Sequence, residues 1–372
     1  IAETRAATFL EIAKRGKMPF PLVPFKAQTG RHGATQKLNC FTAGNELLTP
    51  SGWVDVAAYV EGTPLAQVQL STGEISWDLN PAWLEKDYEG AIYDIQGTAY
   101  KACVTADHRI PFYTRGKWHS RTAEELSALI RLDGLPYKGQ AVWKKMNELS
   151  DDELILLTAL QADGYVTAGG AYIFGFRKTR KIEKLRALLM RMNIHHSYHV
   201  YKGDTHTFRI PKQHIPTRVQ KIGKGFGSWV LTLDARQRAI ILDELPFWDG
   251  YKNIRSKATE FYTADRQQAD WVNTLMHLSD VGGKVYDYSN KRCNKYVVYA
   301  KSAKTTTVNR KDIRKSHGVC RVYCPKVSTD AVLVRRDGCI SVIHQCQNLP
   351  ARGGDTYLRQ SMGAPKDHAV VT

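Results

Sequence analysis

The feature that most constrains this chain is a pair of chemically reactive ends that lie far apart in the sequence. The first end is Cys40, which opens the stretch CFTAGNELLTPSGW. The second end is the run His344, Gln345 and Cys346, which closes the stretch VSTDAVLVRRDGCISVIHQC. Two thiols, a carboxamide and an imidazole supply each nucleophile needed to move an acyl group from one peptide to another. The sequence therefore predicts acyl transfer between these two ends.

The sequence outside the two ends reads as one protein that has been interrupted. Residues 1–39 end in TGRHGATQKLN, and residues 346–372 begin with CQNLPARGG. Joined, these flanks resemble the family A DNA polymerases, in which a TGR motif precedes an N-L-Q-N-[IL]-P run and a basic, glycine-rich turn. In that family a metal-binding aspartate follows soon after the position of Thr372, so we expect no polymerase chemistry from the fragment.

The segment between the flanks resembles an intein inside its host protein. The resemblance implies that the Cys40 thiol attacks the carbonyl of Asn39 and that Cys346 then takes over the acyl group. It also implies that Gln345 attacks its own backbone carbonyl, assisted by His344, and releases the segment. Inteins usually end in Asn, which closes a five-membered ring, whereas Gln345 must close a six-membered one. No cofactor is implied for this splicing reaction.

Three further residues match the intein pattern. The stretch VTADHRIPF contains Thr105 and His108 and resembles the intein block T-x-x-H. By that resemblance His108 protonates the departing amide nitrogen and Thr105 positions it, and general acid catalysis is typically worth ~10²- to 10⁴-fold. Cys324 lies where many inteins carry an Asp or Cys that tunes the transfer. A domain that cleaves itself without ligation is the alternative, but it would need neither Cys346 nor continuous flanks.

Length, charge and cysteine content place further limits on the chain. With 372 residues and 43% hydrophobic content, the chain can form two or three domains with real cores. The net charge of +17 and the interleaved aromatics favour a nucleic-acid partner over a membrane. Seven cysteines without a regular framework indicate a reducing compartment. Because no signal peptide or membrane-spanning run is present, we expect a cytoplasmic protein. We also expect the protein to be a monomer.

Secondary-structure signals divide the chain between the flanks into two kinds of sequence. Residues 40–145 and 300–345 contain short runs of β-branched and aromatic residues separated by turn signals. Residues 150–299 show helical patterns that alternate with short strands. The sequence predicts an all-β domain split by an α/β insert. The intein resemblance implies that the β domain is a horseshoe of the Hint type.

The insert contains an internal repeat. Ser150 and Glu153 form a capping box before one apolar run, and Asp234 and Gln237 form another before a second run. Each run is followed by an extended stretch, a second helix and two more short strands. A helix, two strands, a helix and two strands, repeated once, predict a pseudo-two-fold α/β domain.

The two apolar runs, LTALQADG and LDELPFWDG, resemble the LAGLIDADG dodecapeptide of homing endonucleases. They end at Asp163 and Asp249, each followed by a glycine, Gly164 or Gly250, that is expected to cap the helix. The resemblance implies that the two carboxylates hold Mg²⁺ against a scissile phosphate of double-stranded DNA at the intein-free host gene. The alternative is a decayed nuclease that only binds DNA, because Pro246 and bulky side chains interrupt the second copy.

Overall fold

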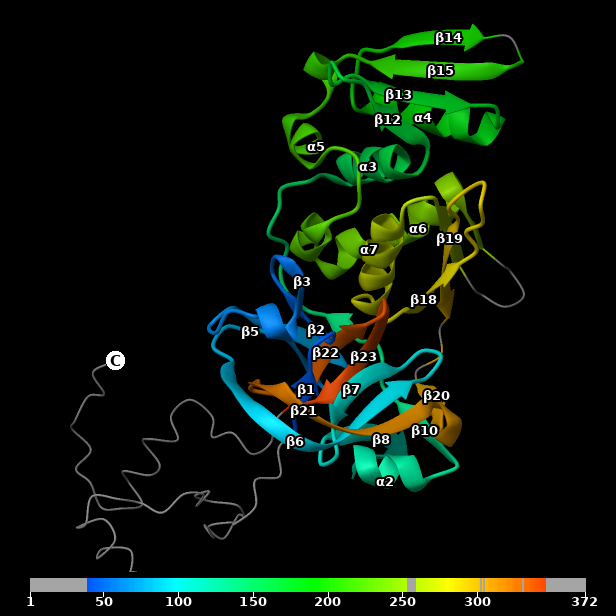
Figure 1. Ribbon diagram of the computed structural model, residues 1–372. Coiled ribbons are helices and arrows are strands. Elements are labelled where there is room, and N and C mark those ends of the chain that lie inside the picture. The colour runs from blue at the N-terminus through cyan, green and yellow to red at the C-terminus, as the bar shows by residue number, and fades with distance from the viewer. Residues whose placement is uncertain are drawn as a thin grey trace, which may run out of the picture.

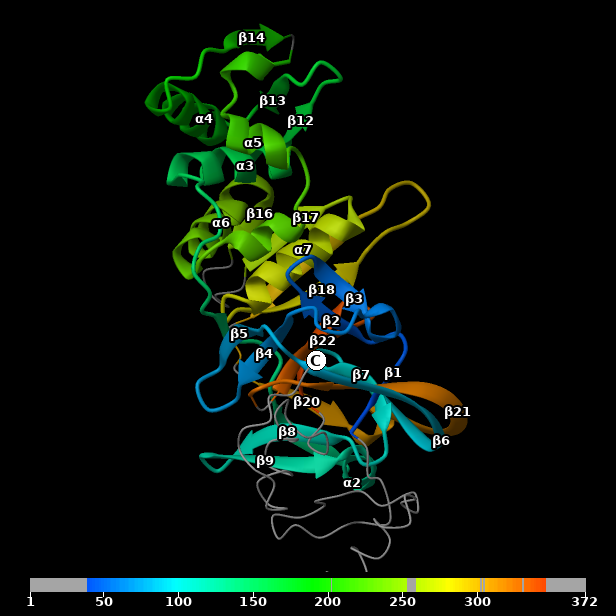
Figure 2. The ribbon, with the colours of Figure 1, turned by 90° about the vertical axis from the view of Figure 1, so that its left-hand side faces the viewer.

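The molecule consists of two units that lie one above the other, as the two views in Figures 1 and 2 show. The β unit contains the described residues of 39–141 and 305–345, and the α/β unit contains those between 147 and 301. None of the helices in the described part of the chain is long and apolar enough to cross a membrane. The computed structural model describes residues 39–201, 203–252, 259–301, 303, 305–329 and 331–345, so both flanks and Cys346 lie outside it.

A small closed barrel forms the first part of the β unit. Its strands are β1 (Phe41–Thr42), β6 (Ala82–Gln96), β7 (Lys101–Thr105) and β21 (Ile313–Lys326). The two long strands β6 and β21 pair antiparallel over their full length. The short strand β1 closes the barrel because it pairs with both β7 and β21. Strands from opposite ends of the chain therefore share one barrel.

A seven-stranded sheet forms the second part of the β unit. In spatial order it contains β11 (Gln140–Ala141), β5 (Glu74–Asp78), β4 (Leu65–Gln69), β22 (Ala331–Arg336), β2 (Glu46–Thr49) and β3 (Gly52–Asp55), and β23 (Cys339–His344) pairs with β22. Strand β22 lies between two strands from the N-terminal segment. The remaining elements of the unit are η1 (Val56–Ala58), β8 (Arg109–Thr114), β9 (Lys117–Thr122), α2 (Ala123–Ala128), β10 (Arg131–Leu135), β20 (Thr306–Asn309) and η4 (Arg310–Asp312).

Buried polar contacts fix β23 against the barrel. Tyr100 is fully buried, and its hydroxyl donates to the Val342 carbonyl at 3.0 Å. The neighbouring Lys101 backbone N–H donates to the Ser341 hydroxyl, also at 3.0 Å. A buried hydroxyl that lost its partner would incur about 1–3 kcal/mol, so these bonds select one placement of β23. That placement brings the last residues of the segment next to the first.

The α/β unit contains the predicted repeat. The first half runs α3 (Asp151–Asp163), β12 (Gly164–Val166), β13 (Tyr172–Phe176), α4 (Thr179–Arg191), β14 (Ser197–Tyr201) and β15 (Thr205–Ile210). The second half runs α6 (Ala235–Asp249), β16 (Gly250–Lys252), β17 (Thr259–Thr263), α7 (Arg266–His277), β18 (Gly282–Asp287) and β19 (Tyr296–Lys301). The sheets have matching orders, β12-β13-β15-β14 and β16-β17-β19-β18, so the predicted element order is confirmed. Shorter helices, η2 (Lys212–His214), α5 (Thr217–Ile222) and η3 (Ser228–Thr232), connect the halves.

The two central helices begin as the sequence predicts. Ser150 and Glu153 form a reciprocal capping box at α3, and Asp234 and Gln237 form one at α6. Each cap satisfies backbone N–H groups that the helix leaves unpaired and contributes about 1 kcal/mol. The caps therefore start both halves of the repeat at equivalent positions.

The glycines after these helices stand at the C-cap positions, as the sequence predicts. Both Gly164 and Gly250 have extended backbones, with φ of −93° and −162°, and not the left-handed conformation that is common where helices end. A Cβ on Gly164 would lie 2.8 Å from Leu160 Cδ1, and a Cβ on Gly250 would lie 2.3 Å from the Glu260 carbonyl oxygen. Glycine is needed there because the preceding helix and the next strand, β13 or β17, pack too closely for a side chain, and the φ angle is not the reason.

Helix α7 fastens the α/β unit to the β unit, and both views place it beside β3. The Trp53 indole N–H donates to the Thr274 hydroxyl at 3.0 Å. The Asn273 side-chain amide donates to the carbonyl of Gly338, in the turn between β22 and β23, at 3.2 Å. The helix therefore contacts the hairpin whose second strand ends at His344.

Candidate functional site

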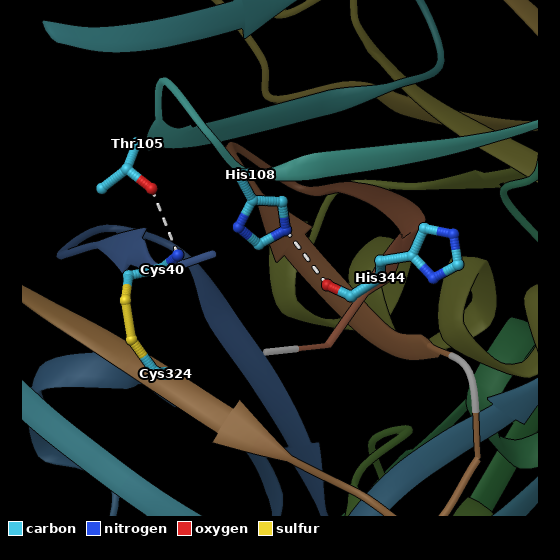
Figure 3. The surroundings of a disulfide bond; sticks show 5 residues. All are labelled: Cys40, Thr105, His108, Cys324 and His344. Carbon is cyan, nitrogen blue, oxygen red and sulfur yellow. Dashed lines mark hydrogen bonds between the residues drawn. A yellow bond between two sulfur atoms is a disulfide. The ribbon is translucent and has the colours of Figure 1, made fainter. Parts of the chain in front are cut away.

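The first candidate site surrounds Cys40, which is fully buried. Its backbone N–H donates to the Thr105 hydroxyl at 3.2 Å, and its carbonyl accepts from the Thr105 N–H at 3.1 Å. Thr105 ends β7, which pairs with β1 directly after Cys40. The threonine thus holds both sides of the backbone at the first end of the segment (Figure 3).

His108 lies between the two ends of the segment. Its Nε2 is 3.0 Å from the His344 carbonyl oxygen. Because a carbonyl can only accept, Nε2 carries the proton and donates. The sequence predicted His108 at the Cys40 amide, and the Cys40 backbone acts on the ring, while the Cys40 N–H itself donates to Thr105. Figure 3 shows the His344 carbonyl facing His108 and the His344 imidazole pointing away from it.

Burial keeps the His108 ring neutral. Complete burial, with a smaller contribution from the nearby His344 imidazole, lowers the pKa of His108 to about 3. The backbones of His344 and Cys40 oppose this shift, although Nδ1 makes no hydrogen bond within the described residues. The neutral ring can therefore donate a proton only from Nε2 and accept one only at Nδ1.

Cys40 and Cys324 form a disulfide. The sequence predicted no disulfide, and it assigned Cys324 only a tuning role. The two sulfurs meet because β1 and β21 pair antiparallel with Phe41 opposite Tyr323, which brings Cys40 opposite Cys324. A disulfide sulfur is not a thiolate nucleophile, so Cys40 can attack a carbonyl only after reduction. The other cysteines within the described residues are free: Cys103, Cys293, Cys320 and Cys339.

Gln345 is held at both ends of its carboxamide. The side chain is buried, and its Oε1 accepts from the Val327 N–H at 3.0 Å. Its Nε2 donates to the Thr329 carbonyl at 2.7 Å. The sequence identified Gln345 but not the turn of residues 327–329 that binds it. The structure thus brings Cys40, Thr105, His108, Cys324, His344 and Gln345 together, whereas Cys346 lies outside the described residues.

The second candidate site lies where α3 and α6 end. Burial, followed by the charge of Asp163, raises the pKa of Asp249 to about 6. The carboxylates of Asp163 and Asp249 therefore lie close enough to repel each other. The sequence raised the concern that Leu242, Leu245 and Trp248 would hold the helices apart. Leu245 and Trp248 are buried in the core of the α/β unit, Leu242 packs against that core, and α3 and α6 still pack against each other.

Lysines that the sequence identified only as members of basic clusters, and did not place at this site, surround these carboxylates. Lys181 Nζ lies 2.5 Å from Asp163 Oδ2, and the lysine side chain is only 9% exposed. Lys224 donates to the carbonyls of Leu160 and Gly164 at the end of α3. Burial lowers the pKa of Lys224, and the charges of the two aspartates oppose that shift. These lysines were hard to identify because they reach the carboxylates from α4 and from a connecting loop.

The second sheet of the α/β unit has an open aromatic and basic face. Phe261 and Val298 point into the core, so alternate residues on the same strands point outward. Lys284 Nζ lies 4.5 Å from the centre of the Tyr286 ring, and Lys295 Nζ lies 5.8 Å from that of Tyr262. A hollow on this face is lined by Glu260, Tyr262, Tyr286, Tyr288, Lys295, Val297 and Tyr299.

Two curated proteins match this chain in sequence, and no family model matches it. The ribonucleoside-diphosphate reductase subunit beta of Aquifex aeolicus is 25% identical over 357 residues, which cover 82% of this chain and 50% of the relative. The ATP-dependent Clp protease proteolytic subunit of Chlamydomonas moewusii is 25% identical over 195 residues, which cover 52% of this chain and 18% of the relative. The chain thus spans half or less of each relative.

Solved structures that resemble this chain include LAGLIDADG proteins. The homing endonuclease I-DmoI, in complex with DNA and Mn, has 12% identity and a TM-score of 0.30 over 41% of this chain and 89% of its own. The N-terminal LAGLIDADG domain of DUF199/WhiA has 15% identity and a TM-score of 0.31 over 42% of this chain and 80% of its own.

Proposed function

We propose that this chain is an intein in its host protein, which excises residues 40–345 and joins Asn39 to Cys346. The observation that carries the proposal is the position of His108. Its ring donates to the carbonyl of His344 at one end of the segment, while the adjacent Thr105 holds the backbone of Cys40 at the other. An enzyme acting on a separate substrate would have no need to join its own two ends in this way.

The first step exchanges an amide for a thioester at Asn39. The Cys40 sulfur bonds to the Asn39 carbonyl carbon, the bond from that carbon to the Cys40 nitrogen breaks, and the thiol proton moves to the departing nitrogen. Thr105 is the hydroxyl in contact with that nitrogen, so it is placed to relay the proton. Positioned proton transfer of this kind typically contributes ~10²- to 10⁴-fold.

The later steps move the acyl group and release the segment. The Cys346 thiol attacks the thioester and frees the Cys40 thiol. The Gln345 side-chain nitrogen then bonds to the Gln345 backbone carbonyl carbon, the peptide bond to Cys346 breaks, and one proton moves from Nε2 to the departing nitrogen. His108 polarises the preceding carbonyl through its neutral Nε2–H, and His344 assists.

The β unit is assigned as the splicing domain, a Hint-type horseshoe formed by residues 40–145 and 300–345. Its support is the pairing of strands from both segments in one barrel and one sheet. Residues 1–39 and 346–372 are assigned as flanks from a family A DNA polymerase. The two curated relatives are named for unrelated activities, and the chain matches only part of each. A segment carried inside different host proteins would give this pattern.

A second activity, cleavage of double-stranded DNA, is assigned to residues 150–299. The supporting observation is that two equivalent helices bring Asp163 close enough to Asp249 to raise the pKa of Asp249. Two mutually repelling carboxylates fit a divalent cation, so Asp163 and Asp249 would hold Mg²⁺. When bound, the ion would act as a Lewis acid on a phosphodiester. Lys181, now paired with Asp163, would have to move aside or turn to the phosphate; if it stays, the unit only binds DNA.

The open face of the second sheet is assigned to the DNA. Lys284 and Lys295 would neutralise phosphates, and the net charge of +17 would make binding strongly salt-dependent. The target is the host gene without the intein, around the Asn39/Cys346 junction. The protein is assigned to the cytoplasm as a monomer, where a reducing environment would keep Cys40 a thiol.

Mass spectrometry of the purified full chain in reductant tests the splicing proposal. The wild type should yield a segment with the mass of residues 40–345 and a joined product of the two flanks. Cys40→Ala should yield neither, because no thioester can form. Cys293→Ala, which removes an exposed free cysteine elsewhere, is the matched control and should splice normally. A joined product from Cys40→Ala would show that the mechanism is wrong.

A further inference from the structure

We propose that Asp78 is a positioning residue for release of the C-terminal flank, acting on Gln345 through the turn of residues 327–329. The inference rests on the proposed splicing function and adds a residue that neither the motifs nor the acyl-transfer scheme identifies. Asp78 lies at the end of β5 and does not touch either end of the segment. It is connected to Gln345 by a chain of hydrogen bonds.

Asp78 is a buried carboxylate whose hydrogen bonds hold this turn. The residue is only 6% exposed. Its Oδ2 accepts from the Ser328 N–H at 2.6 Å and from the Ser328 hydroxyl at 2.8 Å. Its Oδ1 accepts from the Asn80 N–H at 2.9 Å. Burial of a carboxylate is unfavourable unless it is hydrogen-bonded, so the position of Ser328 is tightly set.

A second buried side chain holds the same turn from β4. Gln67 is 8% exposed, and its Oε1 accepts from the Thr329 N–H at 2.9 Å. Residues 327 and 329, on either side of Ser328, are those that bind the Gln345 carboxamide. Asp78 and Gln67 therefore fix the middle and the far side of the turn, and the turn fixes Gln345.

The two contacts from the turn favour the electronic change that cyclisation needs. The Thr329 carbonyl accepts a hydrogen bond from Nε2 and so increases electron density on the attacking nitrogen. The Val327 N–H donates to Oε1 and stabilises the negative charge that develops there as Nε2 loses its proton. Gln345 has one more rotatable bond than the usual Asn, so its carboxamide needs external restraint to reach its own carbonyl.

The test separates the two ends of the reaction in the reduced full chain. Thioester formation at Asn39 is measured as cleavage by hydroxylamine, and Gln345 cyclisation is measured as release of free 346–372 peptide by mass spectrometry. Asp78→Ala should slow peptide release by ~10-fold or more, because small misplacements of reacting groups have effects of this size. Thioester formation should change less than about twofold, since Thr105 and not this turn holds Cys40. Ser328→Ala, which removes only the hydroxyl bond, should give a smaller delay of the same kind.

Asp55→Ala is the matched control. Asp55 is a carboxylate in the same β unit that also accepts from two backbone N–H groups, those of Gly44 and Ala57, but it does not lead to Gln345. If Asp78→Ala and Asp55→Ala slow both steps in equal proportion, Asp78 is merely structural and the inference is overturned. If Asp78→Ala does not fold, equal rates in Ser328→Ala and wild type overturn it. A wild type that forms thioester but never releases peptide overturns the proposed function as well.

Discussion

The two candidate sites on this chain are assembled in opposite ways. Cys40 and Gln345 stand at the two ends of the segment, and they share one region because β1 pairs with β7 while Lys101 of β7 and the preceding Tyr100 hydrogen-bond to β23. Asp163 and Asp249 end two copies of one local pattern, a capped helix followed directly by a strand. One site depends on long-range strand pairing, and the other depends on duplication.

The sites also differ in charge. His108 is fully buried, and its pKa of about 3 keeps it neutral at all physiological pH values. Asp249 is partly exposed among lysines, and its pKa of about 6 places its titration close to neutrality. The site proposed for acyl transfer thus contains a neutral, desolvated imidazole, whereas the carboxylate site contains charged groups. Each should therefore respond to conditions that leave the other unchanged.

Oxidation should abolish excision and leave DNA cleavage unchanged. This is the largest difference between the two sites that we expect. With the Cys40–Cys324 disulfide intact, excision should be absent, and it should begin when dithiothreitol is added. Plasmid cleavage should be the same with and without reductant. Gel time courses of one preparation measure both. Cys324→Ser should excise without reductant, and excision by a fully oxidised wild type would remove the basis for this contrast.

Removing one carboxylate should reduce only the DNA cleavage that is proposed for the α/β unit. Asp163→Asn should lower Mg²⁺-dependent cleavage of a plasmid carrying the intein-free junction by ~10³-fold, the upper range for loss of one charge-stabilising group. Excision should be unchanged. Asp152→Asn is a control on the same helix, where the carboxylate is paired with Arg191. Equal cleavage by wild type and Asp163→Asn, or none by either with DNA binding retained, would favour the DNA-binding alternative.

Acid should weaken the carboxylate site through Asp249. Its folded pKa of about 6 lies above the ordinary value of 3.8, so the folded protein holds this proton below about pH 6. Mg²⁺ binding, followed by titration calorimetry, should weaken by up to about tenfold per pH unit below 6. The same raised pKa makes ionised Asp249 destabilising above pH 6, and this cost shrinks as pH falls from about 6 toward the ordinary value of 3.8. Asp249→Asn should therefore raise the Tm more at pH 8 than at pH 5; equal gains would contradict the assignment.

The ring size at Gln345 should give the smallest effect. Gln345→Asn removes one rotatable bond and closes a five-membered ring, so release of the C-terminal flank should be about threefold faster, as expected from the lost rotamer entropy. The gain is limited because the shorter side chain cannot reach both Val327 and Thr329. Time courses of peptide release compare the two proteins, with DNA cleavage as the unchanged reference. Identical courses would mean that cyclisation is not the slow step.

Local patterns in the sequence predicted much of the α/β unit. The capping boxes at Ser150 and Asp234 and the Asp-Gly helix ends involve residues within a few positions of each other, so the sequence displays them directly. The lysine that pairs with Asp163 was not predicted, since Lys181 is one of many basic residues near the start of α4 and only packing selects it. The two glycines were predicted at the helix ends, but their extended backbone was not, because it follows from the packing of each helix against the next strand.

In the β unit the sequence identified reactive residues but not their neighbours. Cys40, Thr105, His108 and Gln345 belong to recognisable motifs. The register that places Cys324 opposite Cys40 joins strands 284 residues apart, and no local signal encodes it. Asp78 and Gln67 were missed because single polar residues in a strand pattern ordinarily indicate a solvent-facing position, whereas these two are buried.

Helix α7 has a consequence for how such a chain can evolve. Its contacts with Trp53 and with the Gly338 turn mean that part of the β-unit surface is covered by the α/β unit. A lineage that deleted the α/β unit would uncover an indole and a turn beside the strand carrying His344. Such a deletion should therefore destabilise the β unit unless substitutions also make this surface polar and stabilise the hairpin on its own.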